Sequence, residues 1–182
     1  MSETADITAQ ARDIDRLYRA KARAEIAEAD ALLNGTDAVS CDGDELADVV
    51  LVKGEPGAGD RAAGRVLAGA DGDAAGKALD ALGLPETRFA ICSRPAPADT
   101  PTRARRLRLI IEAVDPRVVI ALDTAAGEDL AAAFSIAPQT PGVPVRVLGR
   151  ELLVIEGLEA SLADEKLKRR VWSQFQSLDH RG

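Results

Sequence analysis

Apolar residues recur every three or four positions across residues 6–33, with charged residues between them, which predicts one long amphipathic helix. Asn34-Gly35 follows and supplies a helix stop. Further helices are predicted over about 73–82 and from Asp123-Thr124 to Phe134. Another begins at Thr100, which can cap it, with Pro101 at the first helical position. A last helix is predicted after residues 161–164, which resemble a capping box. The apolar positions of the first helix are Ile7, Ile14, Leu17, Tyr18, Ile26, Leu32 and Leu33.

Short apolar runs between these helices predict buried strands over 48–52, 88–92 and 117–123. Two more runs, 145–148 and 151–156, flank Gly149-Arg150, whose leading glycine suits a hairpin turn. Helices that alternate with buried strands indicate a layered α/β domain with a mainly parallel sheet. Ligands of such sheets bind beyond the carboxyl ends of the strands, here residues 53–60, 93–100, 123–126 and 156–160.

The composition is that of an ordinary globular domain, with 182 residues, 46% hydrophobic and 29% charged. No run of about 20 apolar residues is present, so we expect no membrane span. The acidic first residues lack the apolar core of a secretory signal, which favours a cytoplasmic location. Two cysteines, Cys41 and Cys92, are too few for a disulfide framework or a four-cysteine metal site, so neither a metal nor a cofactor is predicted.

Charge is distributed unevenly along the chain. Residues 1–91 hold 10 Lys and Arg against 18 Asp and Glu. Residues 92–182 hold 13 Lys and Arg against 12 Asp and Glu. An acidic first half repels a polyanion, so binding of nucleic acid is doubtful and would depend on two basic clusters. Each cluster lies on a predicted outward helix face, for which solvation is the simpler interpretation. The clusters are Arg103, Arg105, Arg106 and Arg108, and Lys166, Lys168, Arg169 and Arg170.

The glycine-rich segment from Gly54 to Gly59 is the first candidate site. A strand that ends in such a turn exposes backbone N–H groups that can cradle an anion, although the segment has neither a P-loop ending nor a dinucleotide fingerprint. A turn that needs only glycine's backbone freedom is an equal alternative. Carboxylates at the same rim could do acid–base work, but solvated loop carboxylates are the simpler interpretation; these are Glu55, Asp60 and Glu156 or Glu159.

Five segments in order, across residues 38–178, resemble the uracil-DNA glycosylase superfamily, most closely its bacterial iron–sulfur branch. The segment VVLVKGEPGAGD (49–60) is similar to that branch's first motif, and Gly64-Arg65 with GADG (69–72) falls where the next motif stands. SRP (93–95) with TPT (100–102), DPRVVIAL (115–122) and LKRRVW (167–172) resemble the later motifs. The resemblance implies a three-layer α/β/α sandwich around a four-stranded, mainly parallel sheet, with a base-binding pocket at the strand ends.

The residues that carry the family's chemistry are replaced in this chain. By the resemblance, the first-motif Glu falls on Gly54, with Glu55 one place later, and the uracil-stacking Phe falls on Leu67. The His-Pro-Ser positions become Gly157, Leu158 and Glu159, and the only histidine of the chain is His180. The base-reading Asn is absent, and two cysteines cannot hold the branch's cluster.

These observations favour a uracil-DNA glycosylase-like protein without catalytic residues, which acts as a binding or regulatory module. The alternative is a DNA-repair glycosylase, or a nucleoside or base hydrolase, whose altered chemistry uses rim carboxylates. We predict an N-terminal helical arm (1–36), which could bind a protein partner or a second copy through helix 6–33, and an α/β domain (37–182). The predicted binding residues are Gly54, Glu55, Pro56, Gly57, Asp60, Leu67, Gly157 and Glu159.

Overall fold

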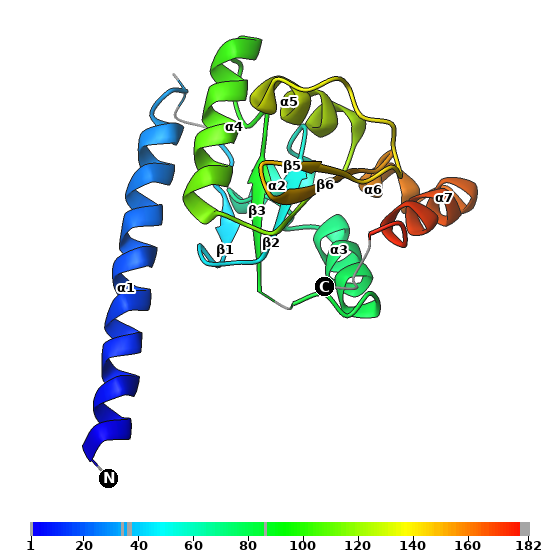
Figure 1. Cartoon of the computed structure of the whole chain (residues 1–182). Coiled ribbons are helices and arrows are strands. Elements are labelled where there is room, and N and C mark those ends of the chain that lie inside the picture. Colours follow the sequence, from blue (N-terminus) through cyan, green and yellow to red (C-terminus); the bar gives the residue numbers. More distant parts are fainter. Residues whose placement is uncertain (1, 34, 36–37, 86, 179–182) are drawn as a thin grey trace.

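A six-stranded mixed sheet forms the centre of the molecule in the computed structural model (Figure 1). The structure describes residues 2–33, 35, 38–85 and 87–178, with side chains from Ile7 onward. The strand order is β1-β3-β2-β4-β6-β5; the four inner strands are parallel and the two edge strands are antiparallel. The strands are β1 Asp42–Gly43, β2 Val49–Lys53, β3 Arg88–Cys92, β4 Val118–Ala121, β5 Val145–Val147 and β6 Arg150–Val154.

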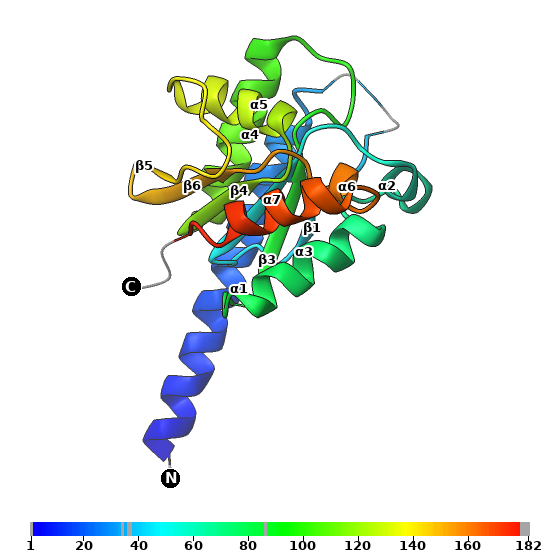
Figure 2. The ribbon, with the colours of Figure 1, turned by 90° about the vertical axis from the view of Figure 1, so that its right-hand side faces the viewer.

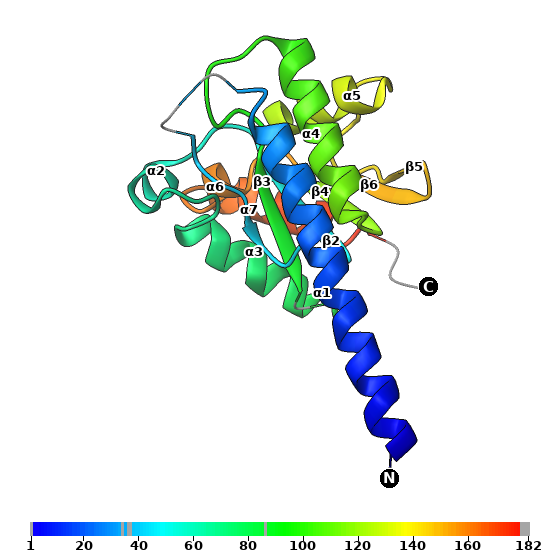
Figure 3. The same ribbon diagram turned by 90° about the vertical axis from the view of Figure 1, so that its left-hand side faces the viewer.

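Helices cover both faces of this sheet. α4 and α5 cover one face, and α3, α6 and α7 lie on the other, where Figure 2 shows them in front of the sheet. α1 lies outside α4 and forms an additional layer (Figure 3). The helices are α1 Ser2–Asp30, α2 Ala58–Ala63, α3 Ala70–Ala81, α4 Thr100–Val114, α5 Thr124–Phe134, α6 Leu158–Ser161 and α7 Glu165–Phe175.

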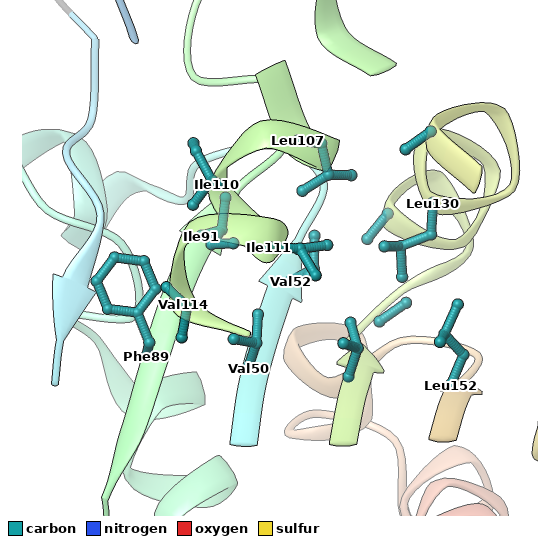
Figure 4. Close-up of a cluster of buried hydrophobic side chains, with 14 of the residues drawn as sticks. Val50, Val52, Phe89, Ile91, Leu107, Ile110, Ile111, Val114, Leu130 and Leu152 are labelled. Atoms are coloured by element: carbon teal, nitrogen blue, oxygen red, sulfur yellow. The ribbon is translucent and has the colours of Figure 1, made fainter. Parts of the chain in front are cut away.

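Alternate residues of the buried strands fill two separate cores. Val50 and Val52 of β2 face α4 and α5, where Figure 4 shows them among Ile91, Leu107 and Leu130 (Figure 4). The intervening residues of β2, Val49 and Leu51, face α3 and α7 instead. Burial on both faces explains why the sequence of these strands is a continuous apolar run rather than an alternating one.

The predicted α/β sandwich is confirmed, with a correction to the number of strands. The four parallel strands are present, but β1 and β5 extend the sheet to six. β1 has only two residues, too few to produce a hydrophobic pattern. The hairpin turn is Leu148-Gly149 rather than Gly149-Arg150; both residues have positive φ, 49° and 84°, and Arg150 already belongs to β6.

Three helix starts also differ from the prediction. Asp99 rather than Thr100 caps α4, because its side chain accepts a hydrogen bond from the Thr102 N–H. Asp164 caps α7 in the same way, so residues 161–164 are not a capping box and Ser161 ends the short α6 instead. α3 begins three residues before the predicted Asp73, at Ala70. In α4 and α7 an aspartate side chain satisfies free N–H groups of the first turn, whereas α3 begins after Gly69 without a side-chain cap.

The first helix is longer at its start and shorter at its end than the predicted range 6–33. Its C-terminal half packs on α4 through Ala22, Ile26 and Ala29, which are at least nine-tenths buried. Its N-terminal half projects beyond the rest of the molecule in all three views (Figures 1–3). The predicted stop at Asn34 and the predicted domain boundary at 36–37 lie outside the described residues. Of the helices described, none is long and apolar enough to span a membrane.

Candidate functional site

An open cleft of about 470 Å³ lies at the carboxyl ends of the parallel strands. The sequence predicts a site at this edge, and three of the four expected rim segments line the cleft. Lys53 and Glu55 come from the end of β2, Asp123 follows β4, and Glu156 follows β6. The remaining wall comes from the starts of α3, α5 and α6: Asp71, Thr124, Ala125, Gly157, Leu158, Glu159 and Ala160, with Leu122 at the end of β4.

Lys53 forms the floor of the cleft and is only 4% exposed. Its Nζ lies 2.8 Å from Asp60 Oδ2, 2.6 Å from Asp71 Oδ2 and 2.8 Å from Glu159 Oε2. Asp60 and Asp71 are buried as well, whereas the Glu159 side chain is 57% exposed. We call these four residues the Lys53 cluster. One ammonium therefore joins three segments that the sequence separates widely: the turn after β2, the start of α3 and the start of α6.

The hydrogen bonds of this cluster keep Lys53 and Asp60 ionised. Burial lowers the pKa of Lys53, but the hydrogen bonds to the three carboxylates outweigh it, so the pKa lies above its usual value. Burial raises the pKa of Asp60, but hydrogen bonds from Lys53 and from the N–H groups of Gly57 and Ala68 outweigh burial. The pKa of Asp60 therefore lies below its ordinary value. Asp60 is therefore an ionised acceptor at neutral pH, and not the proton donor that general acid catalysis requires.

The glycine-rich turn does cradle anions, but these anions are the protein's own carboxylates. The Gly54 N–H donates to Asp123 Oδ2 at 2.9 Å, and the Gly57 N–H donates to Asp60 Oδ2 at 2.8 Å. The second oxygen of Asp123 accepts from the Ala126 N–H and caps α5. These two N–H groups are thus already engaged, and a phosphate would have to displace the carboxylate of Asp123 or the buried carboxylate of Asp60 to reach them.

Close packing, and not an unusual backbone angle, requires glycine at these two positions. Neither residue has a positive φ. A Cβ at Gly54 would stand 2.6 Å from Asp123 Oδ1 and 2.8 Å from the Ala125 Cβ. A Cβ at Gly57 would stand 2.8 Å from Glu159 Oε1 and 3.0 Å from Lys53 Nζ. The alternative of a turn that needs only glycine dihedrals is therefore wrong for Gly54 and Gly57.

A second ion cluster lies beside the cleft. Arg94 donates through Nε to Asp129 Oδ2 at 2.8 Å, and Ser93 Oγ donates to the same oxygen at 2.7 Å. Arg94 NH1 also lies 3.9 Å from Glu55 Oε1. The nearby Cys92 thiol donates to the Gly54 carbonyl, and burial raises its pKa to about 12, so it is a poor nucleophile. Ser93 and Cys92 therefore stabilise the strand end.

The eight predicted binding residues divide into three groups. Glu55, Gly157 and Glu159 line the cleft itself. Gly54, Gly57 and Asp60 lie directly behind it, around Lys53 and Asp123, and Pro56 is buried in the same turn. Leu67 is not part of this arrangement, because it packs against both the α3 core and a small cluster around Val66, and it lines a separate hollow of about 250 Å³.

The basic clusters do not both form outward faces. Lys166, Lys168, Arg169 and Arg170 are exposed, as predicted. In the other cluster, Arg106 is only 1% exposed, which contradicts the prediction. Its guanidinium donates to Asp30 of α1 and to the Cys92 carbonyl, each at 2.8 Å. Arg106 therefore docks α1 on the domain and is unavailable to a phosphate.

Lys53 and Asp71 were not predicted as functional residues. Lys53 follows an apolar run in the sequence, and Asp71 stands in the GADG segment before the predicted helix 73–82. A charged residue at the end of a buried strand, followed by acidic residues in a glycine-rich turn, is the one signal that could have indicated the Lys53 cluster. Its partners Asp71 and Glu159 are 18 and 106 positions away, and no local pattern connects them.

The electrostatics of the cleft disfavour an anionic ligand. Of the described residues that line it, Lys53 is the sole cation, and three carboxylates neutralise it. Glu55 and Glu159 have side chains 64% and 57% exposed at the mouth, and Glu156 is held by Arg170 at 2.9 Å. Among the described residues, no group of three or more His, Cys, Asp or Glu side chains is arranged to hold a metal ion.

A scan of the chain against models of known protein families finds no match, and a search of curated proteins finds no matching relative.

Proposed function

We propose that the protein is a non-catalytic, uracil-DNA glycosylase-like binding module, and that its cleft accepts a neutral or cationic ligand in place of a flipped base in DNA. The observation that carries this proposal is the Lys53 cluster. Asp60 and Asp71 are fully engaged by a buried ammonium, and Glu159 is bound to the same atom. Both carboxylate oxygens of Asp60 accept hydrogen bonds, so this buried group holds the fold together and is not free to activate water.

The last-motif position gives independent support. By the resemblance, the family's histidine falls on Gly157, which lines the cleft without a side chain, and Glu159 stands two residues later. A uracil anion that left the sugar would meet a carboxylate where the family places a hydrogen-bond donor. Loss of one such donor typically lowers the rate by about 10²–10³, and a negative charge in its place lowers it further.

The alternative, an altered hydrolase that uses rim carboxylates, depends on Glu55. It is the exposed acid that lies nearest the first-motif position, and the Arg94 guanidinium lies 3.9 Å from its carboxylate. Its replacement does not disturb a buried contact, so a Glu55 variant separates loss of activity from loss of fold.

Uracil release from single- and double-stranded DNA, at low salt and high protein concentration, tests the proposal. We expect no release above background and no DNA binding that weakens steeply with salt. Glu55→Ala is the informative variant, and Glu112→Ala on α4, away from the cleft, is its matched control. Release by the wild-type protein and by Glu112→Ala, but not by Glu55→Ala, would overturn the proposal and support the hydrolase. Equal release by all three, retained in proportion to the protein through further purification, would also overturn the proposal and would point to a group other than Glu55.

A further inference from the structure

The projecting half of α1 carries the same apolar stripe that docks the other half on the domain. Ala22, Ile26, Ala29 and Leu33 are buried at spacings of four, three and four. Continued toward the N-terminus at the same spacings, the stripe passes through Tyr18, Ile14, Ala11 and Ile7. These positions share one face of a helix. The exposed apolar surface is therefore an extension of an existing interface.

Nothing in the described part of the chain covers this extension. Ile7, Ile14 and Tyr18 are 63%, 45% and 60% exposed, and Leu17 beside them is 67% exposed. Figures 1 and 3 show that α1 continues well past the end of α4, the helix on which its other half packs. A helix of about 12–15 residues is only marginally stable in water without packing. A continuous apolar stripe on such a segment is typical of an interface.

We propose that the projecting half of α1 pairs antiparallel with the same segment of a second copy of this chain. The spacing of the stripe is symmetric about its midpoint, between residues 12 and 13. An antiparallel pair centred there places Ile7 opposite Tyr18 of the partner subunit and Ala11 opposite Ile14 of the partner subunit. A twofold interface requires such a self-complementary surface, and the paired small and large side chains let the two helices approach closely.

The charge along α1 favours the antiparallel direction. In the sequence, residues 2–15 contain four acidic residues and one arginine, whereas residues 16–23 contain four basic residues and no acid. An antiparallel pair brings the acidic segment of each copy beside the basic segment of the other, and a parallel pair would align like charges. Arg19 and Arg23 also bind Asp44 and Glu45 of their own domain, which fixes where the projecting half begins.

The area of the pair sets the expected strength. A contact of about three helical turns is smaller than the roughly 1,200–2,000 Å² of a standard stable interface. We therefore expect a dimer that dissociates on dilution. This inference concerns α1 alone and does not depend on the function proposed for the cleft.

Sedimentation equilibrium on the full chain tests the dimer. We expect the mass to rise with concentration from 19.1 kDa toward twice that value. Ile14→Asp places a charge at the centre of the pair and is expected to weaken dimerisation by about tenfold or more. Leu148→Asp, at a 67% exposed position in the turn between β5 and β6, is the matched control and should dimerise as the wild type does. Unchanged circular dichroism verifies that both variants fold.

Two results would overturn the proposal: a monomer at every attainable concentration, or a dimer that Ile14→Asp does not weaken. Disulfide trapping checks the direction of the pair. A mixture of Ile7→Cys and Tyr18→Cys chains should form a crosslinked heterodimer, whereas Ile7→Cys alone should not crosslink to itself. A parallel pair would instead crosslink Ile7→Cys chains to one another, and the mixture would form no crosslinked heterodimer. Binding of a different protein to the stripe of a strictly monomeric chain would also contradict the proposal.

Discussion

Two buried cations, Lys53 and Arg106, stabilise two different parts of this molecule. Lys53 is bound by three carboxylates, two of them buried, at the floor of the cleft. Arg106 is bound by one carboxylate, that of Asp30, which is 42% exposed, and by the Cys92 carbonyl. Both side chains are at least 95% buried, so the difference lies in what each would leave behind if it were removed. Loss of Lys53 leaves two buried carboxylates without a counterion, whereas loss of Arg106 leaves an aspartate that can turn toward water.

This difference indicates what each cation does. The Lys53 cluster fixes the loops around the cleft to one another, so it is part of the fold's centre. Arg106 fixes a helical arm to the outside of the domain. Variants of the two residues should therefore differ in the size of their effect and in whether it is global or local.

Lys53→Met should produce the largest effect. A buried ion pair broken on one side destabilises a protein by about 3–5 kcal/mol, because an uncompensated charge remains. Here two such charges remain, so we expect a loss at the upper end of that range in chemical denaturation, spread over the whole domain. Lys77→Met, at an exposed position of α3, is the control and should change stability by less than about 0.5 kcal/mol. A Lys53→Met protein as stable as that control would refute the structural role of the cluster.

Arg106→Met should have a smaller and more local effect. Methionine fills the same space, and the principal loss is the hydrogen bond to the Cys92 carbonyl, which we expect to cost about 1–3 kcal/mol. Asp30 becomes solvated. Hydrogen exchange in α1 should accelerate while exchange in β2 and β4 changes little. Equal acceleration in α1 and in the central strands would show that the arm is not a separate unit.

Gly54→Ala tests the close packing behind the cleft, and its effect should be no larger than that of Arg106→Met. The new Cβ meets the Asp123 carboxylate and the backbone of α5, and overpacking of this kind costs about 1–3 kcal/mol. Gly59→Ala is the matched control in the same turn, because its Cβ would stand 3.4 Å from the nearest atom and α2 is helical there. Gly59→Ala should be neutral or slightly stabilising. Equal effects of the two substitutions would contradict the packing argument.

The comparison also shows why sequence predicted the layers better than the site. The apolar runs 48–52 and 88–92 and the stripes on α1 and α4 predicted the elements, since burial of one face imposes a period that is visible locally. Arg106 was interpreted from residue type, which favours exposure for charged side chains, and Lys53 was assigned only to the rim segment 53–60. Their burial depends on partners such as Asp30 and Glu159 that lie more than 70 positions away. β1 was missed because two residues carry no pattern.

The resemblance to glycosylases remains a prediction, and the placement of its motifs explains what it could and could not indicate. Glu55, Gly157 and Glu159 do meet at one cleft, because the carboxyl ends of parallel strands lie at one edge of the sheet. Leu67 lines a different hollow, in the loop between α2 and α3, where it has a positive φ of 56°. Sequence order places a motif near a strand end, but loop geometry decides which side chains enter the pocket.

The most direct test of the central claim, that the cleft is built on an ion cluster instead of an acid–base pair, is the titration of Asp60 by carbon-13 NMR of its carboxyl group. We predict that Asp60 stays ionised down to a pH below 3.8, because Lys53 and two backbone N–H groups stabilise its charge. A lowered pKa in the folded state stabilises the protein above the unfolded value, and this contribution is lost as the pH falls through the folded value. An Asp60 carboxyl that titrates near neutral pH would be a proton donor poised for catalysis and would contradict the account.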